Sequence, residues 1–147
     1  MFKKILVPTD GSPLSDQAIN AAIEFAKAMS GELVTLCVAE PYVYSALVEG
    51  AGVFPIDSVA YDEKAQEIAQ HNVDKVAALA RAQGVACKTE VALSFSPYEA
   101  IVKTAEASAC DVIFMASHGR KGLNKLFVGS ETQKVLAHST LPVLVFR

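Results

Sequence analysis

Two glycine-containing stretches carry the residue types from which a phosphate site could be built. The first is PTDGS, from Pro8 to Ser12, and the second is ASHGRKGLNKLFVGS, from Ala116 to Ser130. In the second stretch, three glycines remove the side chains that would keep a phosphate away from the backbone N–H groups. Three basic side chains lie among these glycines: Arg120, Lys121 and Lys125. The second stretch therefore combines a bare backbone with positive charge, which suits an anion.

The end of the second stretch has two interpretations. A helix that begins at Gly129-Ser130 would offer a phosphate unpaired N–H groups and the positive end of its dipole, with the hydroxyls of Ser130 and Thr132 beside them. Ser130 and Gln133 also stand at the spacing of a capping box, which would satisfy the helix start without a ligand. Glu131 stabilises the dipole of an empty helix but would repel a phosphate one residue away. The sequence leaves both interpretations open.

The ionisable residues Asp10 and His118 also have two possible roles each. Asp10 could reach a base, a ribose or a phosphate-bound Mg²⁺, or it could accept a hydrogen bond within its own turn. His118 could contact a sugar or a phosphate, or it could form a hydrogen bond within its loop. No residue looks like a nucleophile with an attendant base. Binding is therefore better supported than catalysis.

The sequence disfavours several other kinds of protein. The P-loop pattern G-x-x-x-x-G-K-[ST] is absent, as is the dinucleotide pattern G-x-G-x-x-G after the first apolar run. The three histidines have no metal-ligand spacing, and the three widely spaced cysteines are typical of free thiols. A net charge of −3 without a basic run argues against nucleic-acid binding. No segment approaches the roughly 18 apolar residues of a membrane helix, so we expect a cytoplasmic protein.

Short apolar runs predict the strands that position the two stretches. Four runs are nearly continuous, as expected of strands buried on both faces of a parallel sheet: Ile5 to Val7, Leu33 to Val38, Val112 to Met115 and Val143 to Phe146. The stretch from Val85 to Leu93 partly alternates, which suits a strand nearer an edge. PTDGS thus follows the first strand, and the second glycine stretch follows the fourth.

Helical patterns separate these strands. The first two apolar stripes comprise Ala18, Ala22, Phe25 and Met29, and then Ile68, Val73, Val76 and Leu79 or Ala80. A third helix begins at Ser96-Pro97, where Ser96 and Glu99 predict a capping box. A short fourth helix runs from near Ser130 to about His138. The connection from Glu40 to Ser58 is too long for an ordinary turn, and it either packs on its own helices or covers a ligand or a partner chain.

The alternation of strands and helices predicts an α/β fold. We expect a doubly wound five-stranded parallel sheet with helices on both faces, formed by a single domain over residues 1–147. If the strand order is 3-2-1-4-5, the loops after the first and fourth strands open into the same crevice, at the carboxyl ends of the strands. The two glycine stretches would then form opposite walls of one site.

The chain resembles the universal stress protein family over nearly its whole length. The resemblance rests on KKILVPTDGS near the start, SPYEAI before the third helix and HSTLPVLVFR at the end. Nucleotide-binding members of that family carry G-x-x-G, nine residues and then G-[ST]. Here Ala116-Ser117-His118-Gly119 is followed by nine residues, Arg120 to Val128, and then by Gly129-Ser130. Ala116 replaces the first glycine of the pattern, and a positive φ there would cost alanine roughly 1–2 kcal/mol.

The resemblance implies the strand order 3-2-1-4-5 and an ATP site in the crevice, with or without Mg²⁺. By position, it places Pro8, Thr9, Asp10 and Val38 around the adenine and ribose. It places Met115, Ala116, His118 and Gly119 along the ribose and phosphates, and Gly129, Ser130, Glu131 and Thr132 at the phosphates. The implied function is an ATP-binding stress-response protein that acts as a nucleotide-dependent regulatory or scaffold module. Any ATP hydrolysis should be slow, because no general base or arginine finger is evident.

The last predicted strand indicates how two copies could associate. The strand from Leu141 to Arg147 would be an apolar edge strand with little charge, which invites aggregation when it is bare. Pairing with its own copy across a two-fold axis would cover this edge, and the resemblance implies the same homodimer. Two alternatives to an ATP-binding protein remain. One is a dimeric interaction protein that binds no nucleotide. The other is a flavodoxin-like FMN protein, whose phosphate loop would follow the first strand and be rich in Ser and Thr, whereas PTDGSPLS contains few of them.

Overall fold

The computed structural model describes residues 2–42, 57–118 and 128–147. In chain order its elements are β1 (Lys4–Pro8), α1 (Pro13–Met29), β2 (Glu32–Ala39), α3 (Ser58–Ala82), β3 (Ala86–Leu93), α4 (Pro97–Ala107), β4 (Val112–Ala116), α5 (Ser130–His138) and β5 (Val143–Phe146). Most of the connection from Glu40 to Ser58 lies outside the described residues. Gly119 and the basic side chains Arg120, Lys121 and Lys125 also lie outside them.

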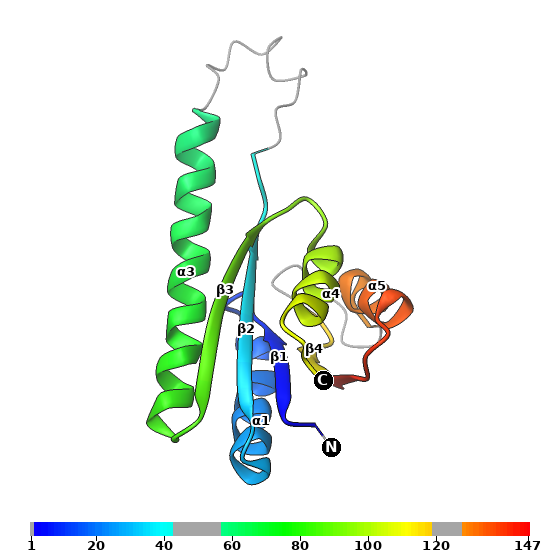
Figure 1. The fold of residues 1–147 in the computed structure, drawn as a ribbon. Helices are drawn as coiled ribbons and strands as arrows, with labels where there is room; N and C mark the ends of the chain where they lie inside the picture. The colour runs from blue at the N-terminus through cyan, green and yellow to red at the C-terminus, as the bar shows by residue number, and fades with distance from the viewer. Residues whose placement is uncertain (1, 43–56, 119–127) are drawn as a thin grey trace.

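The strands form one parallel sheet in the order β3-β2-β1-β4-β5, which confirms the predicted fold class and strand order (Figure 1). In the middle of the sheet, Ile5 of β1 pairs with Leu33 of β2 on one side and with Val112 of β4 on the other. β3 is an edge strand, as its mixed sequence predicts. Lys88 and Glu90 of β3 form an ion pair, with 2.7 Å between Nζ and Oε1. Val91 of the same strand is partly buried and packs against the core.

Helices cover both faces of the sheet. On one face, α1 contributes Ile19 and Ile23 to a buried cluster that includes Ile5 of β1, and α3 reaches the same cluster. On the other face, α4 and α5 contribute Ile101 and Val135 to a cluster around the neighbouring side chains of β1 and β4. The continuous apolar runs of the inner strands follow from this double coverage. None of the helices in the described ranges combines the length and apolarity that crossing a membrane requires.

The inward face of α3 differs from the predicted stripe. Val73 and Val76 are buried as predicted, but Ile68 and Leu79 are 47% and 40% exposed. The sheet is instead contacted by small side chains: Ala69, Ala77 and Ala80. Alanine lets a helix axis approach a sheet closely, so the longer side chains one position away are left on the outer side. The prediction was therefore wrong for Ile68, and of the two residues given for the last position, Leu79 and Ala80, it is Ala80 that is buried.

All three cysteines are free, as their spacing predicts. Burial raises the pKa of the Cys87 and Cys110 thiols to about 11. Both thiols therefore keep their protons at neutral pH, when they are weak nucleophiles.

Candidate functional site

The pairing of β1 with β4 brings the two glycine stretches to the same edge of the sheet. The strands are parallel, with Ile5 opposite Val112 and Leu6 opposite Ile113. The segments that follow, Thr9 to Ser12 and Ser117 to His118, therefore leave from neighbouring carboxyl ends. β2, which carries Val38, lies on the other side of β1. This is the topological switch point at which open α/β sheets bind ligands.

A set of short hydrogen bonds fixes the turn after β1. The Thr9 N–H donates to the Leu36 carbonyl oxygen at 2.8 Å, so the turn is attached to β2. The hydroxyl of Thr9 accepts from the Gly11 N–H at 3.1 Å and lies 3.2 Å from the Ser15 hydroxyl. Gly11 has a φ of +76°, which only glycine adopts without strain. The turn is held by its own polar groups, and Thr9 itself is buried.

Asp10 lies at the tip of this turn. One of its carboxylate oxygens, Oδ1, accepts a hydrogen bond from the Ser12 N–H at 3.0 Å. This confirms the predicted bond within the turn. Ser12 then caps α1, since its hydroxyl accepts from the Ser15 N–H at 3.3 Å. The turn bond fixes where the Asp10 carboxylate stands, and its role toward a ligand stays a prediction.

The beginning of α5 is fastened to the end of β4. The Gly129 N–H donates to the Ser117 carbonyl oxygen at 2.7 Å, and the Thr132 hydroxyl donates to the Ala116 and Ser117 carbonyl oxygens at 3.1 Å each. A Cβ atom at Gly129 would lie only 2.9 Å from that Ser117 oxygen. The φ of Gly129 is −60°, which any residue can adopt. The reason for a glycine here is therefore the close approach of the two backbones.

The predicted capping box at the start of α5 is wrong. The N-cap residue is Gly129, so Ser130 stands one position inside the helix and the N-cap provides no side-chain oxygen. The Gln133 side chain instead donates from Nε2 to the Val128 carbonyl oxygen at 2.6 Å. The helix therefore begins at a glycine with no side-chain cap, at the edge of the sheet that also carries the β1 turn.

The carboxylate of Glu131 binds to α4. Its Oε2 accepts a hydrogen bond from the Tyr98 N–H at 2.9 Å, and its Oε1 lies 2.7 Å from Lys134 Nζ. The bond to Glu131 raises the pKa of the Lys134 ammonium, whose Nζ also lies 5.5 Å from the centre of the Tyr98 ring. Glu131 therefore caps the first turn of α4 from another helix, and its charge is paired there.

The predicted capping box of α4 is absent, because the Ser96 N–H that Glu99 would accept from donates to the Ser94 hydroxyl at 3.0 Å instead. The helix begins at Ser96-Pro97 as predicted, but the Ser96 side chain makes no cap hydrogen bond. Glu131 occupies the Tyr98 N–H, and the Glu99 carboxylate accepts from the Tyr98 hydroxyl at 2.9 Å instead. Local spacing predicted that α4 is capped by its own residues, whereas the acceptor of the Tyr98 N–H comes from α5.

Ala116 and His118 occupy the end of β4. Among the described residues, the non-glycine positions with positive φ are Ser30 and Ala109, so Ala116 pays no left-handed strain for replacing a glycine. His118 Nδ1 lies 3.1 Å from the Ser117 hydroxyl, which confirms a hydrogen bond within the loop. The His118 ring also stands beside Gly129, with Cδ2 3.5 Å from the position of a Cβ atom there.

The site residues inferred from the resemblance lie in two groups at this edge. The ends of β1 and β2 carry Pro8, Thr9, Asp10 and Val38. The end of β4 and the start of α5 carry Met115, Ala116, His118, Gly129, Ser130, Glu131 and Thr132. The Met115 side chain is buried in the core below α4 and α5. Gly119 lies outside the described residues.

Sequence analysis did not include Asn72 of α3, which packs against Gly11. A Cβ atom on Gly11 would lie 2.8 Å from Asn72 Oδ1. One sequence signal could have identified Asn72. It is a polar residue three positions after Ala69 and four before Val76, so it lies on the buried face of the helix. The predicted stripe placed Val73 and Val76 correctly but counted apolar residues alone, so Asn72 was not singled out.

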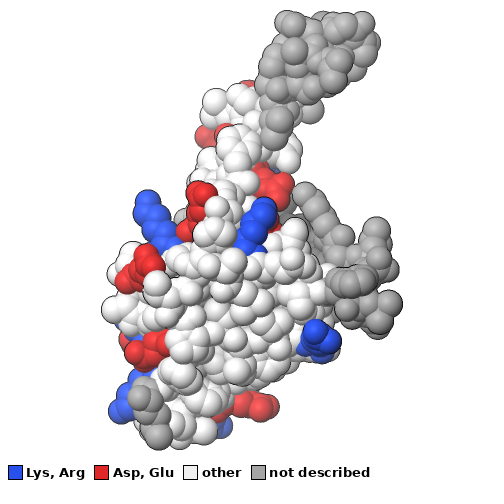
Figure 2. Space-filling model, turned by 90° about the vertical axis from the view of Figure 1, so that its right-hand side faces the viewer, with Lys and Arg blue, Asp and Glu red and all other residues white. Residues whose placement is uncertain are grey.

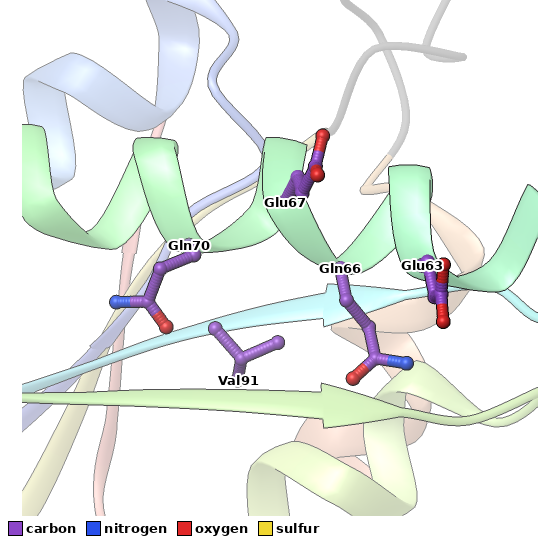
Figure 3. Close-up of a pocket in the computed structure, with 5 residues that line it drawn as sticks. All are labelled: Glu63, Gln66, Glu67, Gln70 and Val91. Atoms are coloured by element: carbon purple, nitrogen blue, oxygen red, sulfur yellow. The ribbon is translucent and has the colours of Figure 1, made fainter. Parts of the chain in front are cut away.

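A groove lies between α3 and β3 (Figure 3). Its volume is about 450 Å³, and it is lined by Glu63, Gln66, Glu67, Gln70 and Val91. Two carboxylates in this lining make the groove unsuited to a polyphosphate.

The sequence model of the universal stress protein family matches residues 1–147. The chain belongs to the universal stress protein family. It is 33% identical to universal stress protein MJ0531 of Methanocaldococcus jannaschii, over 100% of this chain and 83% of that protein. It is also 33% identical to universal stress protein YxiE of Bacillus subtilis, over 100% of both chains.

Solved structures agree with the fold. The structure of the hypothetical protein MJ0577 superposes with a TM-score of 0.81 at 29% identity, covering 99% of this chain and 96% of that one. A universal stress protein solved in complex with cAMP has a TM-score of 0.71 at 19% identity, over 99% and 97% of the two chains. One from Archaeoglobus fulgidus in complex with dAMP has a TM-score of 0.68 at 13% identity, over 100% and 98%. These last two likenesses concern the fold.

The cross-helix cap yields a first prediction. Glu131→Ala removes the acceptor of the Tyr98 N–H, so the free energy of unfolding should fall by about 1 kcal/mol and Tm by about 2–4 °C. Glu131→Gln keeps an oxygen at that position and should retain most of the stability. Glu99→Ala is the matched control, because it also removes a carboxylate near the start of α4 but takes no acceptor from a backbone N–H group there. Equal Tm values for Glu131→Ala and Glu99→Ala in thermal unfolding would show that Glu131 is no cap.

Proposed function

We propose that this universal stress protein binds an adenine nucleotide, namely ATP with or without Mg²⁺, at the carboxyl edge of β1, β2 and β4. In this proposal it acts in the cytoplasm as a nucleotide-dependent regulatory or scaffold module of the stress response. The observation that carries the proposal is the start of α5. A helix that begins at a glycine N-cap, beside the end of a central strand, leaves its first turn open to an anion.

The proposal assigns the phosphates to α5. The backbone N–H groups of its first turn, from Ser130 to Thr132, would bind them, with Gly129 allowing close approach. The Thr132 hydroxyl already donates to carbonyl oxygens at the end of β4, so Thr132 would bind a phosphate through its backbone N–H group. Ser130 is exposed and would add its hydroxyl.

The adenine and ribose fall to the other wall in this proposal. Pro8, Thr9, Asp10 and Val38 would surround them, and Met115, Ala116, His118 and Gly119 would line the ribose and the phosphate chain between the walls. Met115 would do so through its backbone, because its side chain lies in the core. The fixed turn after β1 supports the assignment, because its hydrogen bonds hold Asp10 in place before a ligand arrives. A site that is already ordered loses less conformational entropy on binding.

Two concerns raised by the sequence are reduced by the structure. The Glu131 carboxylate is paired with Lys134 and bonded to Tyr98, which weakens its repulsion of a phosphate at the first turn. Ala116 has no positive φ, so its methyl group brings no backbone strain. Two proteins of the same fold were solved as complexes with cAMP and dAMP, and this supports the proposal.

ATP turnover, in this proposal, is slow at most. Asp10, His118 and Glu131 are ionisable side chains that the structure describes at the two walls. Asp10 accepts from the Ser12 N–H, and His118 Nδ1 is bonded to the Ser117 hydroxyl. Glu131 is engaged with Tyr98 and Lys134, so these contacts serve the local structure rather than proton transfer. Binding rather than chemistry is therefore the proposed role.

The binding proposal predicts the effect of two variants at α5. Gly129→Val places a branched side chain against the Ser117 carbonyl oxygen and the phosphate position, and it should abolish ATP binding in isothermal titration calorimetry. Because this clash could also shift α5, Ser130→Ala serves as a second variant that leaves the backbone in place. It should weaken ATP binding by about three- to tenfold with an unchanged circular dichroism spectrum.

Three results would contradict this account. They are an unchanged Kd in both variants, no binding of ATP-Mg by the wild type, and no adenine nucleotide released from the purified protein. The last two would favour the dimeric interaction protein without nucleotide. A yellow preparation containing FMN would favour a flavodoxin-like protein.

We propose in addition that the protein forms a homodimer through the strand from Leu141 to Arg147. β5 is an edge strand, and Leu144 of β5 and Leu136 of α5 are 49% and 48% exposed. Figure 2 shows the side of the molecule on which α5 and β5 lie, and a broad central area there carries no charged side chain. A second copy would cover both the open strand edge and this area.

The dimer proposal predicts a dimer at micromolar concentration in analytical ultracentrifugation. Leu144→Glu puts a charge into the proposed interface and should yield a monomer. Leu93→Glu is the matched control, because Leu93 is 40% exposed at the opposite edge strand, β3. A monomeric wild type, or equal sedimentation of both variants, would refute the interface.

A further inference from the structure

A polar side chain interrupts the buried stripe of α3. Asn72 is half-buried and adjoins Val73, which is 0% exposed, and it lies one helical turn before Val76, which is 2% exposed. A helix face that packs on a sheet ordinarily carries apolar residues at such positions. An amide there loses hydrogen bonds to water, so its presence needs an explanation beyond packing.

The Asn72 carboxamide packs against the turn after β1. A Cβ atom built on Gly11 would lie 2.8 Å from Asn72 Oδ1 and 3.0 Å from Nδ2. The amide therefore occupies the space that any other residue at position 11 would need. Nδ2 also lies 3.8 Å from Cys37 Sγ, which ties the amide to β2. Glycine is therefore needed at position 11 for two reasons: the amide leaves no room for a side chain, and the φ is +76°.

The hydrogen bonds of Asn72 do not account for its position. A carboxamide can donate two hydrogen bonds and accept two. Within the described part of the chain, its side chain makes the weak bond to the Cys37 sulfur and no other. The position of the amide is instead marked by Gly11, because the carboxamide occupies the space where a Cβ atom of residue 11 would lie.

This contact reaches the proposed nucleotide site through two hydrogen bonds. The Gly11 N–H donates to the Thr9 hydroxyl at 3.1 Å, and the next residue, Ser12, donates from its N–H to Asp10 Oδ1 at 3.0 Å. A shift of Gly11 would thus move both the residue before Asp10 and the donor that orients its carboxylate. The position of Asp10 depends on what supports Gly11.

We propose that Asn72 is a positioning residue of the nucleotide site, whose carboxamide supports the Gly11 turn and so orients Asp10 from α3. The inference rests on the proposed function and deepens it, because it places part of the specificity for the adenosine end of the ligand on α3. Coupling between two sites is reciprocal, so ATP bound at the turn also restrains α3 near Asn72.

The location of the contact predicts which part of the ligand is affected. The contacts of the Asn72 side chain given above are with the turn after β1 and with β2. Loss of its side chain should therefore weaken the binding of ATP and the binding of adenosine by the same factor. A merely structural role would lower the stability of the protein without this pattern.

The contact itself can be tested by stability, with a matched glycine as control. Gly84 has a φ of +77°, almost equal to that of Gly11, but no atom lies within 4 Å of its Cβ position. Gly84→Ala thus reports backbone strain alone, whereas Gly11→Ala reports the strain and the clash with Asn72. We expect the larger fall in Tm for Gly11→Ala, and the excess should disappear in an Asn72→Ala background. Equal falls for the two glycines would overturn the inference.

The closing experiment measures Kd for ATP-Mg and for adenosine by calorimetry, together with Tm without ligand. Asn72→Ala should raise both Kd values by about three- to tenfold with little change in Tm. Val76→Ala is the control on the same helix. It removes a core side chain, so it should lower Tm and leave both Kd values unchanged.

The outcomes separate the inference from the proposed function. If the wild type binds ATP and Asn72→Ala binds it equally well, the inference fails and the proposed function stands. If ATP is weakened but adenosine is not, the inference also fails, since the effect would lie at the phosphates. If the wild type binds neither ligand, both fail.

Discussion

The parallel pairing of β1 with β4 is the constraint on which the candidate site depends. Ile5 opposite Val112 and Leu6 opposite Ile113 set the register, and the register decides that Thr9 and Ser117 emerge side by side. Residues more than 100 positions apart in sequence thereby form two walls of one edge. Any change that shifted this pairing would separate the β1 turn from the start of α5, whatever residues the two segments contained.

Each wall is held by contacts that leave the main chain in a defined place. On the α5 side, Gly129 and Thr132 bind the carbonyl oxygens at the end of β4, while the Glu131 carboxylate is drawn away to Tyr98. The same helical turn thus separates its backbone N–H groups from its only acidic side chain. On the β1 side, Thr9 and Asn72 support the turn from two directions. In the proposed function, the first arrangement leaves the N–H groups of α5 to the phosphates, and the second holds Asp10 in place.

The fold was accessible from the sequence, but the details of the site were only partly so. Continuous apolar runs identify the inner strands because burial on both faces leaves no alternation, and Lys88 and Glu90 mark β3 as an edge. The capping box at α4 failed because the Ser96 N–H is taken by Ser94, and the Tyr98 N–H by a carboxylate from 33 residues away. The box at α5 failed because Gly129, and not Ser130, is the N-cap. Ile68 misled because size suggested burial, whereas the alanines of α3 face the sheet. Asn72 was missed because only apolar residues were counted in the buried stripe.

The central claim is that both walls bind one adenine nucleotide. Titration of ¹⁵N-labelled protein with ATP-Mg, followed by backbone amide chemical shifts, observes both walls in one experiment. The account predicts that the amides of Gly11 and Ser12 and those from Gly129 to Thr132 shift together, with one common Kd. It would be contradicted if saturating ATP moved neither set, or if the shifts were confined to the groove between α3 and β3.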